Sequence, residues 1–132
     1  MYEIERTSYG MRHTFHGILE PKEMKQWYED SQRMIQKMTK PFGIVMDMRQ
    51  VFPFRYETEE ILYEAQKLIE KSGMDRTAVI SEDPKVMTQV RLVSKYAQVH
   101  KKQRFIDSIT RKNWEQLSED WIIEGIDPDR AD

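Results

Sequence analysis

Apolar residues recur along this chain in two patterns, one typical of helices and the other of strands. Residues 21–40 place apolar side chains three and four positions apart, and Pro21 suits the first turn of a helix. That stripe consists of Met24, Trp27, Tyr28, Ser31, Met34, Ile35 and Met38. Because Pro41 restricts the residue before it, we expect this helix to end near Lys40. Residues 42–48, FGIVMDM, form a continuous apolar run that predicts a strand covered on both faces.

The same two patterns continue to the end of the chain. The further elements expected are strands at 77–82 and 104–109 and helices from about 58, from 84 and over 110–124. Asp83 followed by Pro84 is a strong helix opening, with the aspartate as N-cap. Gly73 and Gly125 are suited to end helices. The stripe of the last helix holds Trp114, Leu117, Trp121 and Ile122.

Two extended segments precede the first helix. Residues 2–9 and 11–19 flank Gly10, which we expect to be the turn of an antiparallel hairpin at a sheet edge. The order ββαβαβαβα predicts an α/β fold with a mixed, mostly parallel five-stranded sheet and four helices. Residues 1–132 form a single domain in this interpretation, and 125–132 form a short, polar, mobile tail.

Charge and composition narrow the function. The chain has 21 basic and 23 acidic residues and a formal net charge of -2, which argues against nucleic acid as a partner. It has no cysteine, which removes thiolate metal sites and thiol nucleophiles. His13 and His16 are an odd number of residues apart, so they point to opposite faces of a strand and do not share a metal. No cofactor or metal is expected. The N-terminus lacks a signal-peptide core and no apolar run is long enough for a membrane span, so a cytoplasmic location is expected.

Four stretches carry a resemblance to a known family: HGILEPKEM, PFGIVMDMRQV, RTAVISEDP and RFIDSITRKNWEQLSEDWI. With this order of elements, the chain resembles the SpoIIAA-like (STAS/SEC14-like) family, which has the STAS fold of bacterial anti-sigma-factor antagonists. The likeness covers about the whole chain. It implies a STAS-like regulatory or ligand-binding domain with no established enzymatic activity. In the antagonists the second helix starts with Asp-Ser-Ser/Thr-Gly, and phosphorylation of the serine switches partner binding.

The matching stretch here is Glu57-Thr58-Glu59-Glu60, without the serine or the glycine. Thr58 is then either the N-cap of the helix or the only phosphate acceptor at this place. A third interpretation is that the glutamates resemble the phosphorylated state in charge and fix one binding mode.

The loop after the 42–48 strand is the main candidate for binding. Ligands of parallel sheets bind beyond the carboxyl ends of the strands, where this loop begins. Phe52, Phe54 and Tyr56 either close the core as a lid or form a binding surface, and one ring can pack while another projects. Asp47 and Arg49 share one face of the strand, as an ion pair or as part of the site. Ser81, at the end of the next strand, either binds a polar group or satisfies the loop backbone.

These residues favour a non-catalytic module that recognises a protein partner through the 52–60 loop and the start of the second helix. The alternative is a carrier or sensor of a lipid or other small apolar ligand, for which methionines such as Met24, Met46 and Met48 would line a groove instead of filling the core. An enzyme is not expected, because no convergent catalytic set is visible. A homodimer is compatible with the sequence.

Overall fold

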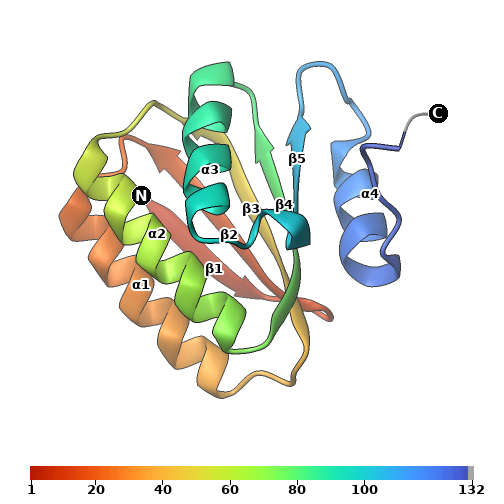
Figure 1. Cartoon of the computed structure of the whole chain (residues 1–132), viewed down its shortest axis with the longest axis horizontal. Coiled ribbons are helices and arrows are strands. Elements are labelled where there is room, and N and C mark those ends of the chain that lie inside the picture. Colours follow the sequence, from red (N-terminus) through yellow and green to blue (C-terminus); the bar gives the residue numbers. More distant parts are fainter. Residues whose placement is uncertain (131–132) are drawn as a thin grey trace.

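The computed structural model describes residues 1–130, which form one five-stranded sheet with helices on both faces (Figure 1). The strands are β1 (Tyr2–Arg6), β2 (Gly10–Gly17), β3 (Phe42–Val51), β4 (Met74–Ser81) and β5 (Gln103–Asp107). The helices are α1 (Pro21–Gln36), α2 (Tyr56–Lys71), α3 (Pro84–Tyr96) and α4 (Trp114–Glu119), with a short 3-10 helix η1 (His100–Lys102) and a π-helical turn η2 (Asp120–Glu124). The sheet order is β1-β2-β3-β4-β5, antiparallel only between β1 and β2. The predicted α/β class and the mostly parallel sheet are confirmed.

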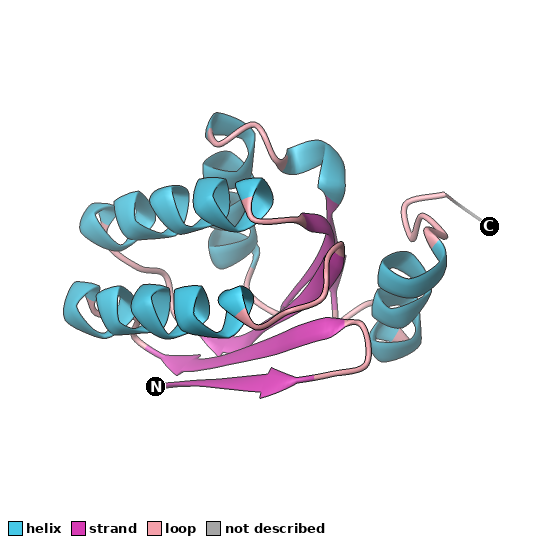
Figure 2. Cartoon of the chain, turned by 90° about the horizontal axis from the view of Figure 1, so that it is seen from below, coloured by secondary structure: helices cyan, strands magenta, loops and turns pink. Residues whose placement is uncertain are grey.

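The two faces of the sheet are covered by different helices. Side chains of β3 alternate between them: Ile44, Met46 and Met48 belong to the larger core under α1, α2 and α3. Val45 points the other way, into a smaller core with Trp121 of η2. Figure 2 shows the paired helices along one side of the strands and α4 apart from them. The predicted burial of β3 on both faces is therefore confirmed.

Gly10 is not the hairpin turn; it is the first residue of β2. The turn lies at residues 7–9 and closes with a hydrogen bond from the Thr7 amide to the Gly10 carbonyl, 3.0 Å. Gly10 is needed for a different reason. Its φ is +151°, and a Cβ there would lie 2.1 Å from the carbonyl oxygen of Gly43 on β3. Glycine at position 10 lets β2 approach the backbone of β3 closely at the start of their parallel pairing, whereas a Cβ on Gly43 would meet Ile122 of η2.

Several element boundaries differ from those expected. Helix α1 ends at Gln36, four residues before Lys40. Helix α2 begins at Tyr56 with Arg55 as N-cap, so Thr58 lies inside the first turn and is not the cap. Helix α4 begins at Trp114 and not at Thr110, because residues 108–113 form the connection from β5, with turns at 108–110 and 112–113. Asp83 is the N-cap of α3 as predicted, and its Oδ1 accepts a hydrogen bond from the Lys85 amide at 2.8 Å.

The C-terminal segment is attached to the domain and is not a free tail. Arg104 donates to Asp127 Oδ1 at 2.8 Å and to Asp127 Oδ2 at 3.2 Å, and Arg111 donates to the Pro128 carbonyl at 3.1 Å. The guanidinium of Arg104 also lies 4.1 Å from the ring centre of Trp121. The expectation of a mobile segment from residue 125 is thus wrong for its first half, and residues 131–132 lie outside the described part.

Candidate functional site

The carboxyl ends of the four parallel strands meet at one rim of the sheet, where the sequence placed the site. A groove of about 680 Å³ lies between the ends of β2 and β3 and the start of α3, and Arg49, Phe52 and Asp83 line it. A second pocket, of about 330 Å³, lies between the ends of β4 and β5 and the same helix. Open parallel sheets bind ligands at this rim, so its side chains are the first to consider.

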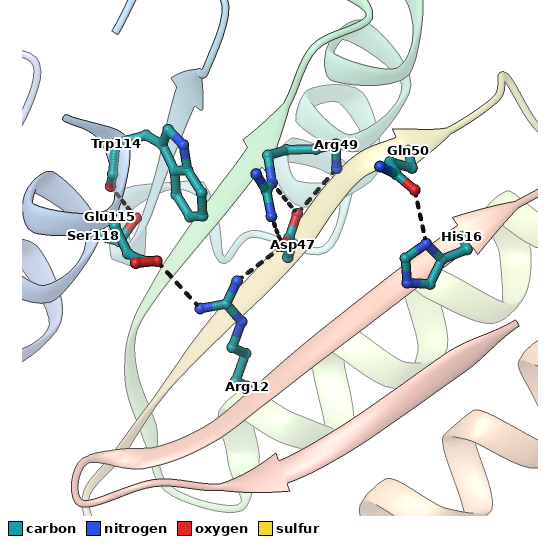
Figure 3. Close-up of polar contacts among 8 residues, drawn as sticks. All are labelled: Arg12, His16, Asp47, Arg49, Gln50, Trp114, Glu115 and Ser118. Atoms are coloured by element: carbon teal, nitrogen blue, oxygen red, sulfur yellow. Dashed lines mark hydrogen bonds and ion pairs between the residues drawn. The ribbon is translucent and has the colours of Figure 1, made fainter. Parts of the chain in front are cut away.

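Asp47 is buried behind this groove and is bound by two arginines (Figure 3). Arg49 donates from Nε to Asp47 Oδ1 and from a terminal nitrogen to Oδ2, both at 2.9 Å. Arg12 of β2 donates to Oδ2 at 2.9 Å, and the Arg49 amide donates to Oδ1 at 3.2 Å. The predicted ion pair of Asp47 and Arg49 is present, and β2 contributes a second cation to it.

Trp114 of α4 completes this cluster. The guanidinium of Arg49 lies 4.2 Å from the ring centre of Trp114, and that of Arg12 lies 5.7 Å from it (Figure 3). Glu115 Oε2 is 4.0 Å from Arg12, so a second carboxylate balances the second cation. These contacts connect β2, β3 and α4 through charge-assisted hydrogen bonds and cation–π stacking.

The electrostatics of Asp47 follow from this setting. Burial acts to raise its pKa, but the hydrogen bonds from the Arg49 side chain and amide, the Arg49 charge and the hydrogen bond from Arg12 outweigh burial, and the net pKa is lowered. The Asp47 carboxyl group is therefore ionised at neutral pH, and both of its oxygens accept hydrogen bonds from Arg12 or Arg49. Such a group holds two strands in register and is poorly suited to accept a proton from a substrate.

The aromatic loop after β3 is divided between core and surface. Phe54 is 6% exposed and belongs to the main core, and its amide donates to Gln89 Oε1 of α3 at 3.0 Å. Phe52 and Tyr56 are 61% and 69% exposed. Phe54 therefore closes the core, as the lid interpretation predicts, whereas the rings of Phe52 and Tyr56 project into solvent.

Thr58 and Ser81 are turned inward. Thr58 is fully buried, and its hydroxyl donates to the Leu19 carbonyl at 2.6 Å. A phosphate on this oxygen would require the start of α2 to move away from the β2–α1 connection. The Ser81 hydroxyl bonds to the backbone of Asp83, accepting from its amide at 3.2 Å. Both side chains stabilise loops at the rim instead of presenting a polar group to solvent.

The two histidines of β2 lie in different environments. His13 is fully buried, and its Nδ1 accepts a hydrogen bond from Trp27 Nε1 at 2.8 Å. His16 is at the rim, where its Nδ1 lies 3.1 Å from Gln50 Oε1 (Figure 3). Among residues 1–130, no three His, Asp or Glu side chains lie together in a way that could hold a metal ion.

Sequence reasoning missed three contributors to this rim: Arg12, Trp114 as a stacking partner, and Ile18. Ile18 is 60% exposed and follows Gly17, whose carbonyl accepts from the Phe52 amide at 3.1 Å. One signal could have found Arg12. A single carboxylate buried within the apolar run of β3 requires a cation as its partner, and polar positions of a neighbouring strand are the nearest source.

With its sheet order and its covered faces, the chain has the SpoIIAA-like fold that the sequence suggested. Among solved structures it is similar to an uncharacterised DUF3478-family protein from Shewanella loihica, described as having a SpoIIAA-like fold. The TM-score is 0.64, and the likeness covers 92% of each chain at 12% sequence identity. This likeness concerns the fold alone. No family model matches the sequence, and no curated protein is significantly similar to it. Within residues 1–130, none of the helices is long and apolar enough to cross a membrane.

Proposed function

We propose that this protein is a non-catalytic binding module that recognises a protein partner at the carboxyl rim of its sheet. One observation carries the proposal: Phe52, which lines the groove at the ends of β2 and β3, is exposed to solvent, as are Ile18, next to the groove-lining Gly17, and Tyr56 at the start of α2. Exposed aromatic rings beside an arginine are the residue types enriched at binding hot spots. We define these three apolar side chains together with Arg49 as the docking rim.

The polar groups behind the docking rim support binding without chemistry. Asp47 has its oxygens occupied by Arg12 and Arg49, and the Ser81 hydroxyl is bonded to the Asp83 backbone. A general base or nucleophile needs an unoccupied oxygen that faces the ligand. Asp47 and Ser81, the polar residues nearest to the strand ends, thus hold the rim in one conformation. A rigid rim loses less conformational entropy when a partner docks.

The packing of the methionines weighs against a carrier of lipid or another apolar ligand. Met24 and Met48 are fully buried and Met46 is 4% exposed, all within the main core. They fill the space between α1, α2 and the sheet that an acyl chain would occupy. The side chains of Ile18, Phe52 and Tyr56 at the docking rim are by contrast exposed to solvent.

The test is a pull-down with a matched pair of variants. A double variant, Phe52→Ala with Tyr56→Ala, removes exposed rings only, so the fold is expected to remain intact by circular dichroism. Tyr96→Ala is the control, because Tyr96 is 74% exposed at the far end of α3. A specific partner should lose at least roughly tenfold in affinity with the double variant and keep its affinity with the control. A partner retained equally by both variants overturns the proposal.

A carrier would give a different result. Native mass spectrometry of the gently purified protein would then show a retained apolar molecule, and the double variant would retain it as well. Phe54→Ala is unsuitable as a probe of docking, because the Phe54 ring is part of the core and its loss lowers stability directly.

A further inference from the structure

Strand β1 forms one edge of the sheet, and no strand within residues 1–130 pairs with its outer side. Met1 and His16 exchange both backbone hydrogen bonds, at 3.0 and 2.8 Å, and the Thr7 amide donates to Gly10 at 3.0 Å. In an antiparallel ladder the residues that bond to the neighbouring strand alternate along the chain. The backbone groups of Tyr2, Ile4 and Arg6 therefore face away from β2.

This edge is held in place by helix α1 at both ends. The Tyr2 hydroxyl donates to Asp30, and Arg6 donates to the Lys37 carbonyl at 2.7 Å. The strand is therefore an ordered template with its pairing groups already aligned. Figure 2 shows this strand, which starts at the N-terminus, along the outer side of the sheet beneath the helices. A preordered edge reduces the entropy that a second strand would lose on pairing.

A groove of about 430 Å³ runs between β1 and α1, beside the free edge. Ile4 and Met34, both packed against the main core, supply its apolar surface, and the charged residues Asp30, Arg33 and Lys37 of α1 also line it. A strand that pairs with β1 would place alternate side chains over this groove and the intervening ones on the opposite face of the sheet. Helix-flanked edges of this kind accept extended peptides by strand addition.

The charges on the face of β1 that points away from this groove determine which kind of strand can pair with it. Glu3 and Glu5 are exposed on that face. Arg12 lies opposite Glu5 in the β1–β2 register, but its guanidinium is directed to Asp47. Two copies of β1 pairing antiparallel, in a register centred on Glu3, Ile4 or Glu5, would place glutamates opposite glutamates. Like charges directly opposite destabilise a strand pair, whereas opposite charges stabilise it. A second copy of this chain is therefore a poor match, and a basic strand is a good one.

We propose that the β1 edge binds an extended segment of a partner protein in which apolar residues alternate with lysine or arginine. The apolar side chains enter the groove beside Ile4 and Met34, and the basic ones face Glu3 and Glu5. Strand addition at β1 is independent of the docking rim, because it uses other residues and a different type of contact.

The probe is a short capped peptide of alternating valine and lysine, added to the whole protein. Hydrogen exchange followed by NMR should show new protection at the amides of Tyr2, Ile4 and Arg6. The same peptide with N-methyl groups on its pairing edge should give no protection, because it cannot complete the ladder. An alternating valine and glutamate peptide should bind more weakly than the lysine peptide. A lysine peptide that leaves the three amides unprotected overturns the proposal.

Charge reversal separates this site from general attraction to an acidic protein. The double variant Glu3→Lys with Glu5→Lys should lower the affinity for the lysine peptide by roughly tenfold and raise the affinity for the glutamate peptide. Glu64→Lys with Glu124→Lys makes the same change of net charge at exposed positions elsewhere and should leave both affinities unchanged. Equal effects of the two double variants overturn the proposal. So does a dimer of the free protein in sedimentation that already protects the β1 amides, because a second copy is then the occupant.

Discussion

Asp47 is a carboxylate in the middle of an apolar strand, and its contacts with two arginines offset the free-energy cost of burying its charge. Asp47→Asn keeps the shape of the side chain but leaves the guanidiniums of Arg12 and Arg49 without their shared anion. We expect a loss of about 2 kcal/mol in the free energy of unfolding at neutral pH, the usual value for hydrogen bonds to charged groups. Urea denaturation measures it. Asp75→Asn, at an exposed position of β4, is the control and should have little effect.

The loss should depend on pH in a definite direction. The pKa of Asp47 is lower in the folded protein than its ordinary value, so the unfolded chain binds this proton first as the pH falls. The contribution is therefore complete above about pH 5 and is lost as the pH falls through the folded pKa. The difference between wild type and Asp47→Asn should shrink accordingly. A difference that stays constant from pH 7 to about pH 3 would contradict this assignment.

His13 gives a second acid-sensitive contribution, from the opposite face of the same sheet. Burial lowers the pKa of His13 to about 3, whereas an unfolded histidine titrates near about 6.5. Stability should therefore fall by up to about 1.4 kcal/mol per pH unit as the pH drops below about 6.5. His13→Gln keeps an acceptor for Trp27 Nε1 and removes the titration, so its stability curve should be flatter between pH 6 and pH 4. Parallel curves for the two proteins would show that another group is responsible.

Single residues also show where sequence reasoning stops. Asp47 and Arg49 could be paired from their spacing, because both lie on one strand and on one face. Arg12 could not be paired with Asp47 in the same way, because their contact depends on the register between β2 and β3. A shift of that register by one residue would turn Arg12 to the other face of the sheet. Trp27 and His13 meet through the packing of a helix on a strand, which no local pattern specifies.

At the scale of elements, the close contact of β2 with β3 depends on the glycine at position 10. Gly10→Ala would place a Cβ 2.1 Å from the carbonyl oxygen of Gly43, and backbone cannot give way as a flexible side chain can. We expect a loss of about 3 kcal/mol or more in the free energy of unfolding, measured by thermal or chemical denaturation.

Gly17→Ala separates the close approach from the backbone strain. Gly17 also has a positive φ, +80°, but nothing lies within 4 Å of a Cβ built on it. Its replacement should cost only about 1 to 2 kcal/mol, the penalty of a left-handed conformation. Equal losses for the two variants would mean that conformation alone, and not the contact with Gly43, makes glycine necessary at position 10.

The type and order of the helices and strands could be predicted from the sequence, but their first and last residues could not be predicted as well. Stripes at helical spacing located α1, α2 and α3, and Asp83 with Pro84 gave the start of α3. The start of α2 was misplaced because Arg55 caps it through an extended backbone without a side-chain bond, which leaves no mark in the sequence. The docking rim was predicted only in outline. Which of Phe52 and Phe54 is buried depends on the position of Gln89 on α3, far along the chain.

For the molecule as a whole, the two cores share the strands that separate them. Ile44 and Val45 are neighbours in β3 but pack into different clusters, and Val79 and Ile80 do the same in β4. The smaller core depends on Trp121, which is 7% exposed and donates from Nε1 to the Thr77 carbonyl at 3.1 Å. Unfolding of one core would expose one face of β3 and β4 to solvent. The other core should therefore not remain folded by itself.

Trp121→Ala tests this cooperativity. The substitution should lower the free energy of unfolding by about 4 kcal/mol, as expected for loss of a buried tryptophan. The informative measurement is hydrogen exchange in increasing denaturant. If the domain is one cooperative unit, the most protected amides of α1 and β4 lose protection in the variant together with those of η2. If the η2 amides exchange early while those of α1 keep wild-type protection, the helices beyond β5 form a separate unit. The Trp114 contact behind the docking rim would then open without unfolding the sheet.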